Sequence, residues 1–420
     1  MSNIKIYATG SIIVLFLSIL LAGGMCYADD WPGFRGPNRD GKSAETGLLK
    51  KWPEAGPEML WSVGELGIGF SSVAVADGFI YTTGMLNGEG FLFAYDLAGK
   101  LKWKKSYGTE WQRSHRGTRT IPTVDNDRVY VFSGTGILAC FGAKTGEEKW
   151  TVDTLKKFQG KNIMWGIAES VLIVGPNAIC TPGGKDASVV ALDKMTGQSV
   201  WTSKDLSEKS SYCSSALVET GGTKLIVTML ERSVVGLDIK TGKVLWKDRI
   251  NEGIGRNNHP VTPLYHDGYI YITAGYEIGG VKYRLSADGT KITKKWEDAV
   301  LDVHHGGVVL VNGYLYGANW NGNARGDWVC LDWDNGKVMY QAGWNGNKGS
   351  LIYADGMLYC YDENTGDVAL VKASPKGFEI VSSFRITKGS GKHWAHPVIS
   401  DGRLYIRHGE ALMAYDIKNK

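Results

Sequence analysis

Six of the eight histidines in this chain lie in segments that follow a strand ending in an aromatic residue. The same segments carry arginine, lysine, tryptophan and tyrosine, which suit an anionic or polyhydroxylated ligand through ring stacking and charge-assisted hydrogen bonds. We therefore expect these segments to form one ligand-binding funnel. The predicted ligand-binding residues are His115, Arg116, Arg119, Trp165, Glu169, Tyr212, Asn258, His259, His304, His305, Lys348, His393 and His396.

Two other interpretations of the histidines stay open. Imidazoles from different repeats can converge on a transition metal, although no helical His-x-x-x-His spacing enforces this. A histidine beside proline, such as His259 or His396, can also be a buried structural hydrogen-bonding group. His304 and His305 are adjacent on extended chain, so we expect only one of them to face the axis. The sequence contains no Gly-x-Ser-x-Gly elbow or zincin motif, and we assign no catalytic residue.

A repeated hairpin positions these segments. Residues 190–201 form two strands around an Asp-x-x-Thr-Gly turn and end in Trp201, and residues 235–246 nearly copy them. The closing aromatic residues are spaced 42 to 51 residues apart, which is the length of a propeller blade. They are Trp61, Trp103, Trp150, Trp201, Trp246, Trp296, Tyr340 and Phe384.

A second hairpin with an Asp-Gly or Asn-Gly turn precedes most of these repeats, as in residues 351–359. Each repeat is thus a four-stranded antiparallel sheet, with strands A to D from the axis outward. The last repeat stops after three strands, near Asp416, whereas residues 59–63 form an outer strand with nothing before it. We predict an all-β, eight-bladed β-propeller in which the N-terminal strand completes the C-terminal blade.

The connections divide between two faces of this ring. We expect the A–B and C–D turns, which are the tight Asp-Gly and Thr-Gly turns, to lie on one face and to be too short to hold a ligand. The D–A and B–C connections lie on the other face around the mouth of the central channel. The ligand site is therefore expected among the longer connections.

The repeat resembles the pyrroloquinoline-quinone (PQQ) type of propeller repeat, shared by quinoprotein alcohol dehydrogenases and the outer-membrane assembly lipoprotein. The segments 30–41, 182–186, 304–307 and 394–398 are similar to exported PQQ-like β-propeller repeat proteins of the planctomycete type. This resemblance covers essentially the whole chain after residue 28, which we divide into an N-terminal extended segment at 29–58 and one propeller domain at 59–420. One such fold hosts both enzymes and scaffolds.

The resemblance implies two alternatives to ligand binding without catalysis. A quinoprotein dehydrogenase-like enzyme would hold PQQ with Ca²⁺, but this chain has no adjacent cysteine pair, and the predicted mouth segments are poor in Asp and Glu, with Glu169 the main candidate. An envelope protein-assembly scaffold would instead present its rim aromatics to a protein partner. The partner is thus expected to be a small molecule, a glycan or an envelope protein, and the chain a monomer.

Residues 1–28 are typical of a secretory signal peptide, with Lys5, an apolar run at 12–22 and a small residue at position 28. We expect a periplasmic or extracellular protein without a membrane span after cleavage; a retained anchor or lipidation at Cys26 is the alternative. A net charge of +4, with acids and bases mixed, gives no basic stripe for nucleic acid. The five other cysteines have no metal-site spacing, and we expect them to be buried strand residues.

Overall fold

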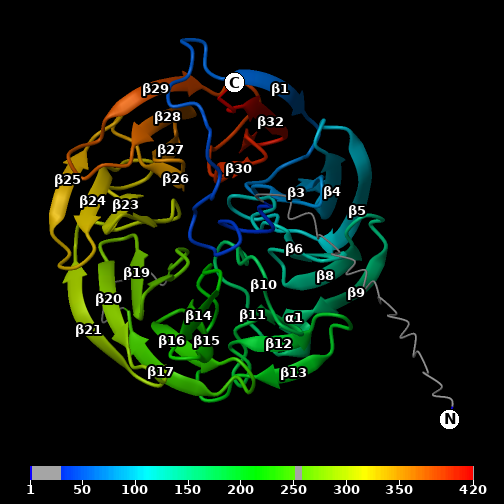
Figure 1. The fold of residues 1–420 in the computed structure, drawn as a ribbon. Helices are drawn as coiled ribbons and strands as arrows, with labels where there is room; N and C mark the ends of the chain where they lie inside the picture. Colours follow the sequence, from blue (N-terminus) through cyan, green and yellow to red (C-terminus); the bar gives the residue numbers. More distant parts are fainter. Residues whose placement is uncertain (2–29, 251–257, 420) are drawn as a thin grey trace.

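The computed structural model describes Met1 and residues 30–250 and 258–419. In this part of the chain, eight four-stranded antiparallel sheets form a ring around a central axis (Figure 1). The predicted eight-bladed β-propeller is confirmed. The signal peptide and Cys26 lie outside the described residues.

The first four blades follow the chain in order. Blade 1 is β2 (Ala74–Ala76), β3 (Phe79–Leu86), β4 (Glu89–Asp96) and β5 (Leu101–Thr109). Blade 2 is β6 (Thr123–Asp125), β7 (Arg128–Phe132), β8 (Ile137–Gly142) and β9 (Glu148–Asp153), followed by the short helix α1 (Thr154–Lys157). Blade 3 is β10 (Leu172–Val174), β11 (Asn177–Cys180), β12 (Val190–Asp193) and β13 (Ser199–Thr202). Blade 4 is β14 (Ala216–Thr220), β15 (Thr223–Met229), β16 (Ser233–Asp238) and β17 (Val244–Arg249).

The remaining blades complete the circle. Blade 5 is β18 (Leu264–His266), β19 (Tyr269–Ala274), β20 (Gly279–Leu285) and β21 (Ile292–Asp298). Blade 6 is β22 (Val309–Val311), β23 (Tyr314–Ala318), β24 (Trp328–Asp332) and β25 (Val338–Ala342). Blade 7 is β26 (Gly349–Ala354), β27 (Met357–Asp362), β28 (Asp367–Lys372) and β29 (Ile380–Arg385). Blade 8 is β30 (Val398–Ser400), β31 (Arg403–His408), β32 (Ala411–Asp416) and β1 (Glu58–Val63).

The ring closes as the sequence predicts. Strand β1 pairs antiparallel with β32, with Val63 opposite Leu412, and so supplies the outer strand of blade 8. This pairing joins the two ends of the propeller and hides the strand edge that an incomplete blade would leave.

The tryptophan at the end of a blade ties that blade to the next one. The indole N–H of Trp150 donates to the carbonyl of Lys194, 3.0 Å away in the turn of blade 3, and Trp201 does the same to Ile239. A Cβ at Gly197 would lie 2.7 Å from the Trp150 ring, and its φ of +72° also favours glycine. The Thr-Gly turn therefore serves blade-to-blade packing.

The N-terminal segment, residues 30–57, runs across the axis of the ring, where Figure 1 shows it in dark blue. Trp31 pairs with Val75 of blade 1, Lys42 with Tyr353 of blade 7, and Leu48 with Lys418 beyond blade 8. Arg39 donates to the carbonyls of Ser170 and Ser215, both at 3.0 Å, which precede blades 3 and 4. The segment thus bridges blades on opposite sides of the channel.

The five cysteines of the described chain are buried free thiols, and four of them lie in strands as predicted. Cys213 is the exception, because it lies in the connection that leads into β14. No helix among the described residues has the length and hydropathy that a membrane span requires.

Candidate functional site

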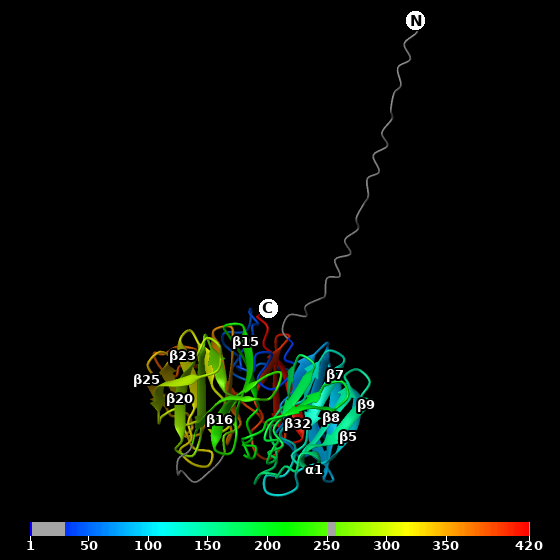
Figure 2. The ribbon, with the colours of Figure 1, turned by 90° about the horizontal axis from the view of Figure 1, so that it is seen from below.

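A cavity of about 700 Å³ opens at one mouth of the channel. Its walls come from the D–A and B–C connections, on the face that carries α1, whereas the N-terminal segment lies toward the opposite face in Figure 2. Phe34 of that segment nevertheless lines the cavity. The N-terminal segment therefore forms part of the inner wall of the pocket.

Nine of the thirteen predicted residues line this cavity. The other four lie elsewhere: Arg116 is exposed, whereas Glu169, His259 and His393 are buried behind the wall. His259 bonds the carbonyl of Leu230 through Nδ1 at 2.8 Å, so its role is that of a structural hydrogen-bonding group. The nine that the structure brings together are His115, Arg119, Trp165, Tyr212, Asn258, His304, His305, Lys348 and His396.

Eight aromatic rings form a continuous belt along the pocket wall. Neighbouring ring centroids are between 4.7 and 6.3 Å apart. Trp394 stands near the middle, with His115 at 5.1 Å and His305 at 5.5 Å, both edge to face. In order along the wall the rings are Tyr212, Trp165, His115, Trp394, His305, His304, Tyr276 and Trp320.

The expectation that only one of His304 and His305 faces the axis is wrong. Both line the cavity, and their rings lie 4.8 Å apart. The strict alternation of side chains holds for β-strands, but these two residues lie in the irregular connection between β21 and β22. There the ring of His304 turns toward Tyr276, whose hydroxyl is 3.2 Å from Nε2.

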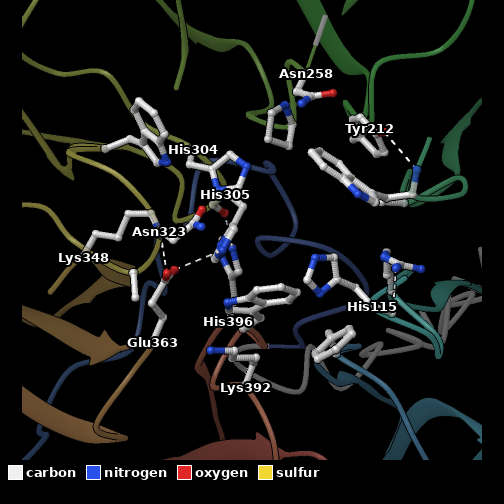
Figure 3. A pocket seen from close by; sticks show the side chains of 18 of the residues that line it. His115, Tyr212, Asn258, His304, His305, Asn323, Lys348, Glu363, Lys392 and His396 are labelled. Carbon is white, nitrogen blue, oxygen red and sulfur yellow. Dashed lines mark hydrogen bonds and ion pairs between the residues drawn. The ribbon is translucent and has the colours of Figure 1, made fainter. Parts of the chain in front are cut away.

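A buried carboxylate organises one end of the pocket. Glu363 is 3% exposed, and it bonds the ammonium of Lys348 and lies 3.0 Å from Nε2 of His305 (Figure 3). Burial by itself would raise the pKa of Glu363, but the charges and hydrogen bonds of His305 and Lys348 outweigh it and lower the pKa to about 2. Glu363 is therefore a fixed anion that orients both Lys348 and His305.

Glu363 is absent from the predicted site residues, and the turn that holds it resembles the turns of the face opposite the pocket. Residues 362–366 read Asp-Glu-Asn-Thr-Gly, the pattern that joins strands C and D in blades 3 and 4. In blade 7 this turn joins β27 to β28, which are strands B and C, and so it lies on the pocket face. The spacing to the closing aromatic residue distinguishes the two kinds of turn. Phe384 follows Gly366 by 18 residues, whereas Trp201 follows Gly197 by only four.

Three histidines of the pocket, His115, His304 and His396, have lowered pKa values and are neutral groups at physiological pH. Burial lowers the pKa of His396 to about 3 and the pKa of His304 well below its ordinary value, and it also lowers the pKa of His115. Nε2 of His396 bonds the backbone carbonyl of His305 at 2.8 Å. These imidazoles thus act as rings and hydrogen-bonding groups.

The pocket carries an excess of positive charge. Its lining holds four permanent cations and one carboxylate, Glu363, which leaves three more cations than carboxylates. Lys348 is paired with that carboxylate, but no described carboxylate forms an ion pair with the other three. These three are Arg119, Arg325 and Lys392.

The donor set does not fit a calcium-bound quinone. Calcium prefers several oxygen ligands, usually with carboxylates among them. The one carboxylate of the lining is already held by Lys348 and His305, and the described part of the chain has no cluster of three or more His, Cys, Asp or Glu that could hold a metal ion.

Glu169 forms a structural site behind the pocket. Its carboxylate accepts hydrogen bonds from the backbone N–H of Thr181, at 2.9 Å, and from the Thr181 hydroxyl, while the other oxygen has no described partner. Burial raises the pKa of Glu169 to about 7, although Thr181 and Arg39 oppose this. The carboxylate is thus partly protonated at neutral pH.

Glu169→Gln should change how stability depends on pH. A raised pKa means that the folded protein holds a proton that the unfolded chain releases above about pH 4.5, so stability falls as the pH rises toward 7. The variant should match the parent near pH 4.5 and be more stable by about 3 kcal/mol at pH 8. Urea unfolding at both pH values measures the difference, and a constant difference at all pH values would contradict the assignment.

The eight four-stranded blades and their tryptophan-ended repeats define the class of quinoprotein-like β-propellers. A family model described as outer membrane protein assembly factor BamB matches residues 88–342, more than half of the chain. The protein belongs to this family of PQQ-like propellers. The resemblance to PQQ-type propeller repeats that the sequence indicates is thereby confirmed.

Curated relatives match over shorter stretches. Quinoprotein alcohol dehydrogenase PedH of Pseudomonas putida is 29% identical over 175 residues, which is 40% of this chain and 27% of that protein. Quinoprotein ethanol dehydrogenase of Pseudomonas aeruginosa is 30% identical over 169 residues, which is 37% of this chain and 26% of that protein. The matches thus span about a quarter of the length of these relatives.

Solved structures share the fold. BamB from Moraxella catarrhalis superimposes with a TM-score of 0.61 at 16% identity, over 86% of this chain and 98% of that one. Quinohemoprotein alcohol dehydrogenase from Comamonas testosteroni gives 0.65 at 13% identity, over 94% of this chain and 82% of that one. At such identities the likeness concerns the fold alone.

Proposed function

We propose that this protein is an exported propeller that binds a small molecule or glycan in the pocket at the mouth of its channel. The observation that carries the proposal is the belt of eight rings around a cavity of about 700 Å³. Ligand pockets typically measure about 300–1,000 Å³ and combine apolar walls with a few placed polar groups. The belt supplies the walls, and Glu363 with its two partners supplies placed polar groups.

Two features of the pocket support a bound ligand rather than bulk water. Phe34 lines the cavity from the N-terminal segment, so the inner end is covered by a side chain. Rings in edge-to-face contact, such as His115 and Trp394, hold one another in place, so the wall is ordered before a ligand arrives. A pre-ordered wall lowers the entropic cost of binding.

The family match also favours a second candidate, an envelope protein partner at the rim of the mouth. The matched family model is described as an outer membrane assembly factor, and Met164 beside the belt residue Trp165 is 74% exposed. Proximity labelling from Met164→Cys in the native host tests this candidate. Labelling of one envelope protein at stoichiometric yield supports it; labelling spread evenly over abundant proteins contradicts it.

Native mass spectrometry of protein exported by its own host tests the pocket. We expect a co-purified ligand that is lost in Trp394→Ala, because that ring contacts Phe70, His115 and His305 in the belt. Tyr314→Ala, a half-buried aromatic at the start of β23 and outside the pocket, is the matched control and should keep the ligand. Equal ligand occupancy in both variants would place the ligand elsewhere and refute the proposal.

A further inference from the structure

We infer that the ligand class of this pocket is an acidic saccharide, that is, a short ring-sugar chain that bears carboxylate or sulfate groups. The inference rests on the proposed function, and it deepens it by naming the chemistry. Three properties of the wall act together: cations without a described carboxylate partner, the fixed Glu363 cluster, and the ring faces of the belt.

The anionic groups of the ligand are assigned to three cations of the lining. Arg119, Lys392 and Arg325 line the cavity, and no described carboxylate forms an ion pair with any of them. Burial is the main cause that lowers the pKa of His115 and of Lys348, and the charge of Lys392 lowers both pKa values further. Several cations around one cavity that have no described carboxylate partner favour a ligand with more than one negative charge, because charge-assisted hydrogen bonds to a carboxylate or sulfate are stronger than neutral ones.

The hydroxyl groups of the ligand are assigned to the asparagine amides of the lining. Asn258, Asn323, Asn347 and Asn364 line the cavity, and each amide offers both a donor and an acceptor, as a sugar hydroxyl does. Glu363 and Lys348 present a fixed acceptor and donor next to Asn364 and Asn347, their neighbours in the sequence. A purely aromatic acid would offer no hydroxyl groups to these amides.

The sugar rings are assigned to the aromatic faces. Trp394, Trp165 and Trp320 belong to three different connections, so a chain of rings can contact one indole after another along the belt. A cavity of about 700 Å³ accommodates a short chain better than a single small anion. The aromatic belt thus selects for the length of the ligand, and the cations of the lining select for its negative charge.

Isothermal titration calorimetry with four probes tests this inference. The probes are tri-galacturonate, its neutral methyl ester, a sulfated galactose trisaccharide and 2-naphthoate. We expect an acidic trisaccharide to bind at least about tenfold more tightly than the ester, with affinity that weakens as salt rises. Binding of the carboxylated probe, the sulfated probe or both identifies the anionic group.

Two variants test whether Lys392 binds the anionic group of the ligand. Lys392→Gln should weaken binding of the acidic probe about tenfold and leave binding of the ester unchanged, since one charge-assisted hydrogen bond is lost. Lys161→Gln is the control, because Lys161 is an exposed lysine of the connection between β9 and β10 that does not line the cavity. Equal losses in both variants would show nonspecific charge attraction and overturn the inference.

Other results separate this inference from the proposed function. Ester binding as tight as acid binding would overturn the charge argument, and binding of 2-naphthoate alone would overturn the saccharide. If no probe binds while a co-purified ligand still depends on Trp394, the pocket function stands and the acidic saccharide is rejected. If that dependence is also missing, both proposals fail.

Discussion

Lowering the pH from about 6.5 to 4 should unfold this protein cooperatively, because three buried histidines are held neutral in the fold. Burial lowers the pKa of His259 to about 4, of His393 to about 4 and of His396 to about 3. An unfolded chain protonates these imidazoles near pH 6.5, so the unfolded state binds more protons in this window and stability falls with the pH. Each destabilises the fold by about 3 kcal/mol at pH 4, and Glu169 opposes them by about 3 kcal/mol in the same window. The remaining loss of about 6 kcal/mol lies within the total stability of a typical domain, about 5–15 kcal/mol.

His259→Asn isolates one of these protons. The asparagine amide can donate to the carbonyl of Leu230 as Nδ1 of His259 does, but it does not take up a proton in this pH range. The slope of unfolding free energy against pH should fall by about one proton between pH 6.5 and 4. Val200→Ala, at an exposed residue of β13 that carries no titratable group, is the control and should keep the parental slope. An unchanged slope in His259→Asn would refute the assignment.

Trp31→Ala should lower the free energy of unfolding by about 3–5 kcal/mol, the usual cost of removing a buried large aromatic side chain. Trp31 is 2% exposed, and its backbone exchanges two hydrogen bonds of 2.8 Å with Val75. Its ring lies over Gly36, where an added Cβ would approach to 3.1 Å. Loss of the ring should therefore loosen the whole N-terminal segment.

The same variant should damage the pocket, since Phe34 is three residues away on this segment and lines the cavity. Urea unfolding and ligand occupancy should both decline in Trp31→Ala, while Trp31→Phe should retain most of each. Leu60→Ala, at an exposed apolar residue of β1, is expected to change stability by less than about 0.5 kcal/mol. Parental stability in Trp31→Ala would show that the segment is not an integral part of the ring.

Local chemistry in the sequence determined the blades. Asp355 and Gly356 adopt φ of 48° and 80°, the turn that an Asp-Gly pair between alternating apolar residues predicts. The spacing of Trp150 and Trp201 likewise predicted the blade length, because each indole must reach the turn of the next blade. A missing fourth strand after Asp416 predicted the closure by β1, since an open edge is unfavourable.

The membership of the site could be predicted only in part. Residue type and the side of the ring were enough to place His115, Trp165 and Lys348 near one mouth, because connections of one kind emerge on one face. The same reasoning included His259 and His393, which turn into the wall, because sequence gives the position of a side chain along the chain but not its direction in an irregular loop. Those directions depend on packing between blades.

Tertiary structure alone decided the centre of the molecule. Phe34 and Arg39 reach the channel because a segment of irregular backbone crosses the axis, and neither periodicity nor turn chemistry specifies that path. Glu363 became the anion of the pocket because the Thr-Gly turn of blade 7 joins inner rather than outer strands. The sequence by itself thus determined the ring, through short-range turns and repeated spacing. Long-range packing across the axis decided what the ring encloses, because those contacts join residues that no local pattern connects.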